Sequence, residues 1–121
     1  MQLTFADRAE DRVIFNVTGG TKAELENRVN LFFISQGYKL KSTEGETITY
    51  EKGNRTARII LGAFVKYNKQ SVTIKSQGDN MQLMMHRDST GMSGGLIGMN
   101  QVKNEFQRIV DAFKANFSIT V

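Results

Sequence analysis

Two stretches of the chain repeat their hydrophobic residues at the spacing of an α-helix. The first carries large apolar side chains at Leu25, Val29, Phe32 and Phe33. Thr21 precedes this stretch as a capping residue, with Glu24 three positions later, and Gly37 follows it where a left-handed residue commonly ends a helix. The pattern predicts a helix over about residues 22–36.

The second stretch lies near the end of the sequence. Its apolar residues are mostly three or four positions apart: Met99, Val102, Phe106, Ile109, Val110, Phe113 and Phe117. This spacing predicts a strongly amphipathic helix of about 18 residues. Phe106, Ile109 and Phe113 share one stripe, and we expect that stripe to complete the hydrophobic core.

Elsewhere apolar and polar residues alternate with the period of two that is typical of strands. The predicted strands are Arg12–Val17, Tyr38–Lys41, Ile48–Tyr50, Arg55–Tyr67, Ser71–Lys75 and Met81–Arg87. We expect turns at Glu44-Gly45, Gly53-Asn54, Asn68-Lys69 and Gln77–Asn80, and a bulge at Gly62.

The predicted element order is therefore β-α-β-β-β-β-β-α. Consecutive hairpins require an antiparallel meander, and both helices have to bury their aromatic stripes against the same face of it. We expect a two-layer α+β fold with a single antiparallel sheet of five to six strands and two helices on one face. At 121 residues the chain is expected to form one domain, residues 1–121.

Composition excludes several kinds of chemistry. The chain has no Cys and only one His, His86, so disulfides, thiolate metal sites and cysteine nucleophiles are excluded and a histidine-based zinc site is nearly so. We expect no metal, no cofactor and no catalytic residue. No apolar run approaches the roughly 18 residues of a membrane span, and the first ten residues are too acidic for a signal peptide, so we expect a cytoplasmic protein.

Charge is distributed unevenly along the sequence. The net charge is +4, but residues 1–46 carry 7 acidic and 6 basic side chains, whereas residues 47–121 carry 5 acidic and 10 basic ones. The second part could therefore bind an anionic partner, although the charge does not require one.

Strand alternation places a set of basic residues on the sheet face that the helices leave open: Lys39, Lys41, Arg58, Lys66 and Lys75. Glu51 is the only acid expected among them, and Thr47, Thr49, Thr73, Gln82 and His86 occupy the polar positions between. This face could bind nucleic acid, or it could be a solvated surface whose lysines prevent aggregation. The apolar residues Ile60, Phe64 and Met84 share the face, and grouped together they would indicate a homodimer.

A glycine-rich segment precedes the second helix, and its candidate binding residues are Gly91, Ser93, Gly94, Gly95 and Gly98. Residues 91–95 match G-x-S-x-G, but the hydrolase mechanism needs a His after the Ser, and His86 comes before it. Backbone amides at a helix N-terminus attract anions, so the segment could hold one, or it could simply connect strand to helix.

The element order resembles that of the TATA-box-binding-protein-like and helix-grip group, over most of the chain and without a shared motif. This resemblance implies the same two-layer fold and selects no activity, because the group includes nucleic-acid binders, ligand carriers and enzymes. The segment from Gly94 to Phe106 is similar to the ends of small uncharacterised bacterial proteins.

Three interpretations of function follow. The first is a non-enzymatic binding or interaction domain that self-associates, with the sheet face or the glycine-rich segment as its contact surface. The second is a nucleic-acid binder that uses the basic face. The third is a carrier or enzyme that holds an anionic small molecule between the glycine-rich segment and the sheet.

Overall fold

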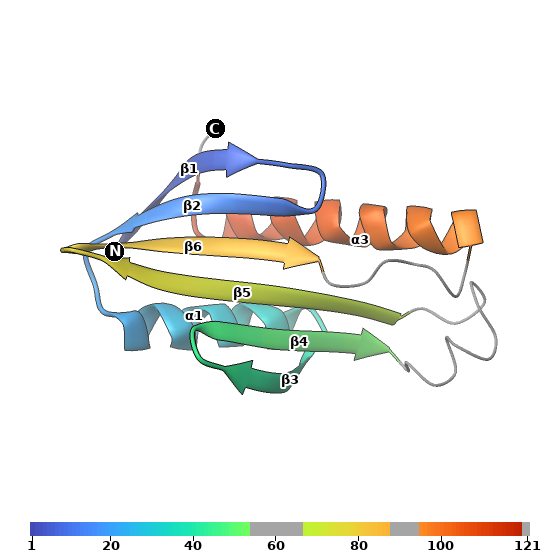
Figure 1. The fold of residues 1–121 in the computed structure, drawn as a ribbon, viewed down its shortest axis with the longest axis horizontal. Coiled ribbons are helices and arrows are strands. Elements are labelled where there is room, and N and C mark those ends of the chain that lie inside the picture. Colours follow the sequence, from blue (N-terminus) through green and yellow to red (C-terminus); the bar gives the residue numbers. More distant parts are fainter. Residues whose placement is uncertain (54–66, 88–94, 120–121) are drawn as a thin grey trace.

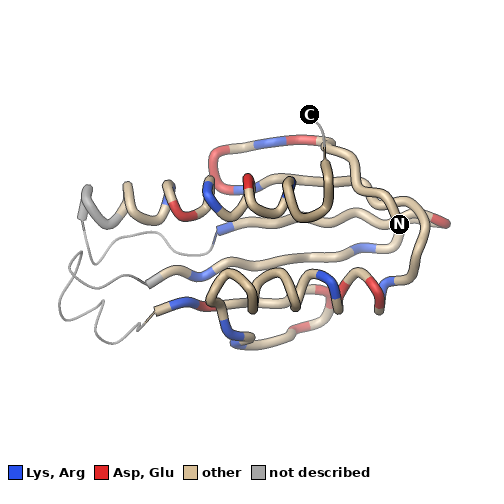
Figure 2. Tube along the Cα trace, turned by 180° about the vertical axis from the view of Figure 1, so that it is seen from behind, with Lys and Arg blue, Asp and Glu red and all other residues tan. Residues whose placement is uncertain are grey.

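A computed structural model describes residues 1–53, 67–87 and 95–119. These residues form a six-stranded antiparallel sheet with two helices on one face, as Figures 1 and 2 show. The strands are β1 (Gln2–Arg8), β2 (Arg12–Thr18), β3 (Lys39–Glu44), β4 (Thr47–Gly53), β5 (Tyr67–Gln77) and β6 (Asn80–Arg87), and the helices are α1 (Lys22–Ser35) and α3 (Gly95–Asn116). The expected two-layer α+β architecture is confirmed.

The sheet order is β1-β2-β6-β5-β4-β3, so β2 and β6 are neighbours although the other elements separate them in sequence. Two tight turns occur where the sequence predicts them. Glu44 pairs with Thr47 and Gln77 with Asn80, and Gly45 and Gly78 in these turns have φ angles of 59° and 61° that suit glycine.

The start of α1 follows the predicted cap. The Thr21 hydroxyl accepts a hydrogen bond from the backbone N–H of Glu24 at 3.1 Å. The Glu24 carboxylate contacts the Thr21 hydroxyl itself at 3.4 Å. At the other end Gly37 has a φ of 87°, and its N–H donates to the carbonyl of Ile34. Both boundaries of this helix are set by local sequence.

Replacing Thr21 with Ala is expected to lower the free energy of unfolding by about 1 kcal/mol, because the N–H of Glu24 loses its acceptor. Urea unfolding followed by circular dichroism measures this difference. Ser35→Ala is the matched control: it removes a hydroxyl at the other end of α1, where alanine is the better helix former, and little change is expected. Equal losses in both variants would contradict the capping role.

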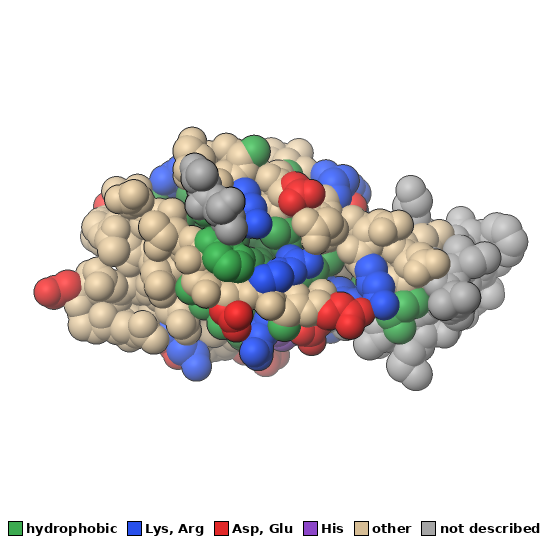
Figure 3. All heavy atoms as spheres, turned by 90° about the horizontal axis from the view of Figure 1, so that it is seen from above, with side chains coloured by type: hydrophobic (Ala, Val, Ile, Leu, Met, Phe, Trp, Pro, Cys, Tyr) green, Lys and Arg blue, Asp and Glu red, His purple; other side chains and the backbone are tan. Residues whose placement is uncertain are grey.

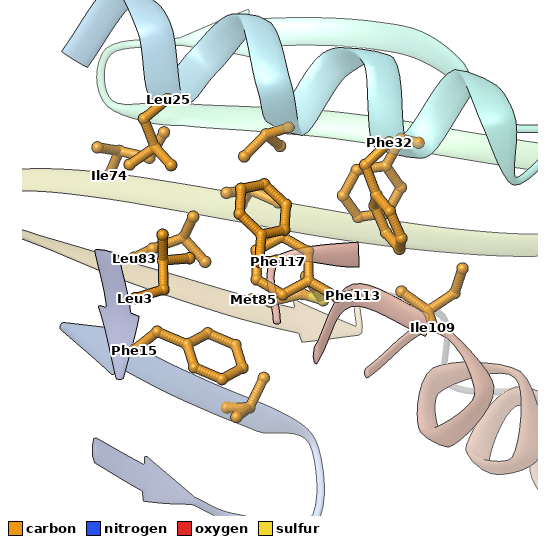
Figure 4. Close-up of a cluster of buried hydrophobic side chains, with 14 of the residues drawn as sticks. Leu3, Phe15, Leu25, Phe32, Ile74, Leu83, Met85, Ile109, Phe113 and Phe117 are labelled. Carbon is orange, nitrogen blue, oxygen red and sulfur yellow. The ribbon is translucent and has the colours of Figure 1, made fainter. Parts of the chain in front are cut away.

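Aromatic side chains fill the space between the helices and the sheet. Phe113 of α3 lies 5.3 Å from Phe15 of β2 and 5.3 Å from Phe32 of α1, and 4.3 Å from Phe117, measured between ring centroids. Figure 4 shows these rings meeting from both layers. Phe106, Ile109 and Phe113 are all buried, which confirms the predicted stripe.

Cations cover the core where it opens beside β1. The Arg8 guanidinium lies 4.9 Å from the centre of the Phe106 ring, and the Lys114 ammonium lies 5.3 Å from that of Phe5. Figure 3 shows this side of the molecule, with hydrophobic side chains in a depression flanked by basic ones. Both cations lie over aromatic rings and shield apolar surface there.

The structure corrects the sequence interpretation at two places. Residues 2–8 form an edge strand that we did not predict. Asn68 and Lys69 do not form a turn but lie inside β5, where they pair with Lys52 and Glu51. The turn expected at Gly53-Asn54 lies partly outside the described residues, and β4 pairs with β3 on one side and with β5 on the other.

Two further predicted elements can be compared with the structure only in part or differ in their bounds. The predicted strand Arg55–Tyr67 and its bulge at Gly62 lie outside the described residues, apart from Tyr67, which begins β5. Helix α3 has 22 residues and begins at Gly95, four positions before the first residue of the predicted apolar stripe.

Candidate functional site

The sheet face turned away from α1 and α3, called the open face here, carries a grid of hydroxyl groups. Thr47 and Thr49 of β4 lie opposite Thr73 and Ser71 of β5. The hydroxyls of Thr47 and Thr73 are 2.9 Å apart, and those of Thr49 and Ser71 are 3.3 Å apart. Each of these hydrogen bonds restrains two side chains, which lowers the entropy cost of binding a ligand over the grid.

A hollow of about 440 Å³ lies over this grid. We call it the hydroxyl hollow. It is lined by Lys41, Ser42, Glu44, Thr47, Thr49, Lys69, Ser71, Thr73 and His86, so β3, β4, β5 and β6 all contribute to it. Every lining side chain carries a polar group, and the hollow therefore suits a polar ligand rather than an apolar one.

Three lysines surround a single acid at one end of this surface. Glu51 of β4 lies opposite Lys39 of β3 and Lys69 of β5, and its carboxylate is 3.9 Å from the Lys41 ammonium. Both side chains of that ion pair are about one third exposed, with relative accessibilities of 31% and 33%. The pair is therefore weak, and positive charge remains in excess around Glu51.

The predicted basic residues are thus only partly brought together. Lys41 lines the hydroxyl hollow and Lys39 lies beside it, but Lys75 is farther along β5, opposite Gln82. Arg58 and Lys66 lie outside the described residues. Of the apolar residues expected on this face, Met84 is half-buried beside Ile14, while Ile60 and Phe64 are also outside the described part.

Sequence reasoning missed Lys69, and a signal for it was present. Lys69 has the same parity as Ser71, Thr73 and Lys75, which places it on the open face once the strand is extended backward. Because the sequence analysis assigned Asn68-Lys69 to a turn, Lys69 was left out of the residues predicted for the open face. His86, placed from the sequence among the polar positions of this face, has intermediate burial and lies opposite Ser71 in the sheet.

The glycine-rich segment gains no new evidence. Gly91, Ser93 and Gly94 lie outside the described residues, whereas Gly95 and Gly98 belong to the first turn of α3. Binding of an anion by this segment stays a prediction.

A second polar group of residues lies on the inner face, beneath the helices. The Tyr38 hydroxyl donates to Glu105 Oε2 at 2.7 Å and accepts from Gln70 Nε2 at 3.3 Å. Arg108 donates to both oxygens of Glu105, at 2.8 and 2.9 Å, and to the Gln36 side chain at 2.8 Å. This cluster ties the end of α1 to α3.

The charges in this cluster shift the pKa values of its members. Burial and the hydrogen bond to Glu105 raise the pKa of the Tyr38 hydroxyl above its usual value. Burial alone would raise the pKa of Glu105, but hydrogen bonds from Arg108 and Tyr38 outweigh it and hold that pKa below its usual value. At neutral pH the cluster therefore contains a carboxylate and a neutral phenol.

Among residues 1–53, 67–87 and 95–119, no group of three or more acidic or His side chains is arranged to hold a metal ion. No helix within these ranges is long and apolar enough to cross a membrane. Models of protein families and the curated proteins give no match to the chain.

Proposed function

We propose that this protein is a binding domain whose open sheet face takes a ligand carrying an oxyanion, such as a phosphate or carboxylate group. The observation that carries the proposal is the hydroxyl hollow, in which ordered hydroxyls lie next to Lys41 and Lys69. Hydroxyl and ammonium groups can both donate, and the two lysines outnumber Glu44, the one carboxylate in the lining, so the hollow favours an anion.

The hydroxyl pair of Thr47 and Thr73 illustrates how such a ligand would be held. One hydroxyl donates its hydrogen to the other, so one hydroxyl hydrogen of the pair is not used by this bond. A ligand oxygen above the grid can accept that hydrogen while a lysine supplies the counter-charge.

Nucleic acid is one source of such oxyanions, and the surface favours contact with phosphates over contact with bases. Among the open-face side chains that the structure describes, none is aromatic, so these side chains offer no ring for base stacking. Binding would then be independent of sequence and strongly dependent on salt.

The test is a titration of ¹⁵N-labelled protein at low salt, once with inorganic phosphate and once with a short single-stranded oligonucleotide. We expect saturable shifts of the amide signals of Thr49, Ser71 and Thr73. Lys69→Glu should weaken oligonucleotide binding and lower its salt slope by about 1. Lys22→Glu makes the same charge change on α1 and should leave binding unchanged. Absence of saturable shifts with both probes would refute the proposal.

The two probes also separate the sources of the anion. Shifts with the oligonucleotide alone would indicate a nucleic-acid binder, because several phosphates are then needed together. Shifts with inorganic phosphate at comparable concentrations would indicate a binder of small anions.

A further inference from the structure

Strand β3 forms one edge of the sheet, at the bottom of the view in Figure 1. Among the strands that the structure describes, only β4 pairs with it, so its outer side has no strand beside it there. An edge strand presents backbone N–H and C=O groups to which the strand of another chain can add. The side chains along β3 then decide which strand fits.

A β-bulge changes the order of side chains along this edge. The register with β4 shifts between Leu40 and Ser42, which makes Lys41 an extra residue. In a regular strand, residues five positions apart point to opposite faces of the sheet. Because of the extra residue, Lys39 and Glu44 both pair with open-face residues of β4 and therefore both lie on the open face.

The order of faces along β3 is consequently the same in either direction. Lys39 and Glu44 lie on the open face at the two ends, and Leu40 and Thr43 lie on the inner face between them. When two copies of β3 pair antiparallel about a two-fold axis at the middle of the strand, Lys39 lies opposite Glu44 of the partner subunit. Leu40 then lies opposite Thr43 of the partner subunit. Opposite charges in such directly opposed positions stabilise the pairing, and like charges destabilise it.

Exposed apolar side chains follow the inner side of this edge. Leu40 is 55% exposed and borders a hollow of about 380 Å³ between α1 and strands β3 and β4. Leu31 and Ile34 of α1 are 57% and 53% exposed. They follow Asn27 and Asn30, which line the hollow, by four residues each, so they extend the same side of α1. Edge-to-edge pairing places the helices of both copies on one side of the joined sheet, where a second copy covers this apolar surface.

We propose that two copies of this chain associate through β3, so that their sheets become one continuous sheet with a two-fold axis. The charges favour a second copy over an unrelated strand, because β3 carries its basic end and its acidic end in the positions that oppose each other in this dimer. Glu44 also lines the hydroxyl hollow, so the hollows of the two protomers lie near the axis on one open face. The association does not depend on what the hollow binds.

Sedimentation velocity over a wide range of protein concentration tests the association. We expect a dimer whose dissociation constant rises at least about tenfold in Glu44→Lys, because that variant places lysines opposite each other at both ends of the contact. The double variant Lys39→Glu/Glu44→Lys exchanges the two charges and should restore the dissociation constant to within about threefold of the parent value. Asp79→Lys makes the same charge change in the turn between β5 and β6 and should leave it unchanged. Circular dichroism checks that each variant is folded.

A mixture of isotope-labelled and unlabelled protein provides a second, independent measurement. Isotope-filtered NOEs are expected between Leu40 and Thr43 of the partner subunit, and a dimer without them would overturn the proposal. A monomer at every concentration would also overturn it and leave this edge to a strand of another protein. Equal dimer stability in the parent and in Glu44→Lys would place the contact on another surface, and a double variant as weak as Glu44→Lys would refute the pairing.

Discussion

Phe113→Ala is expected to lower the free energy of unfolding by about 3–5 kcal/mol. Phe113 is 0% exposed and its ring contacts rings from β2, α1 and its own helix, so the substitution leaves a cavity at the meeting point of both layers. Such a loss approaches the whole stability of many domains of this size. Urea unfolding followed by circular dichroism and by core methyl signals measures it.

Leu31→Ala provides the matched control. Leu31 is a large apolar residue on α1, but it is 57% exposed, so its truncation removes little buried surface. An unchanged midpoint in Phe113→Ala would mean that α3 is not packed on the sheet as described.

Alkaline pH is expected to destabilise the protein through its buried phenols. Burial raises the pKa of Tyr50 to about 12, with the negative charge of Glu26 adding to the effect, and the pKa of Tyr38 is raised as well. In the unfolded chain these groups ionise near pH 10. The neutral phenols therefore make their full contribution to the free energy of unfolding below about pH 10. This contribution is lost as the pH rises toward 12, by up to about 3 kcal/mol for Tyr50.

Tyr50→Phe tests the source of this loss. The variant keeps the ring that stacks on Phe33 at 4.4 Å but cannot ionise. It also loses the hydrogen bond to Asn30 at 3.2 Å, which is expected to cost about 1 kcal/mol at neutral pH. Unfolding curves between pH 8 and 11.5 should show a smaller decline than in the parent protein. The same decline in both would assign the alkaline loss to other groups.

The helices were predictable because their signals are local. The Thr21 cap, the Gly37 end and the apolar stripe through Phe113 are each contained within a few turns of sequence. The two tight turns at Gly45 and Gly78 were predictable for the same reason, since a positive φ favours glycine whatever the rest of the fold does.

Long-range pairing was harder to predict, as β1 and β5 illustrate. The alternation in β1 is broken by a register shift between Phe5 and Asp7, which conceals a strand whose large apolar residues turned inward are Leu3 and Phe5. Asn68 is a common turn residue, and its position inside β5 depends on its pairing with Lys52 far away in sequence. The β-propensity of the residues around Asn68 does not depend on this distant partner, so it cannot predict the pairing.

The open face was predictable in kind but not in its details. Alternation alone places Lys41, Thr47, Thr49 and Thr73 on it, and the structure brings these four together. The contribution of Lys69 could be predicted only if the true start of β5 were known. The unpartnered carbonyl oxygens of Asn68 and Gln70 could be found only in the packed interior, because a polar residue in a sequence does not reveal whether its hydrogen bonds are made.

The pairing of β2 with β6 also constrains the order in which the chain can fold. During synthesis the β1–β2 hairpin leaves the ribosome early, while its partner at residues 80–86 is made much later. Until then the inner edge of β2, with Val13, Phe15 and Val17, has no strand to pair with. Such non-local closure slows folding and exposes a hydrophobic edge to other chains. Until β6 has been made, this edge of β2 is therefore open to pairing with strands of other chains.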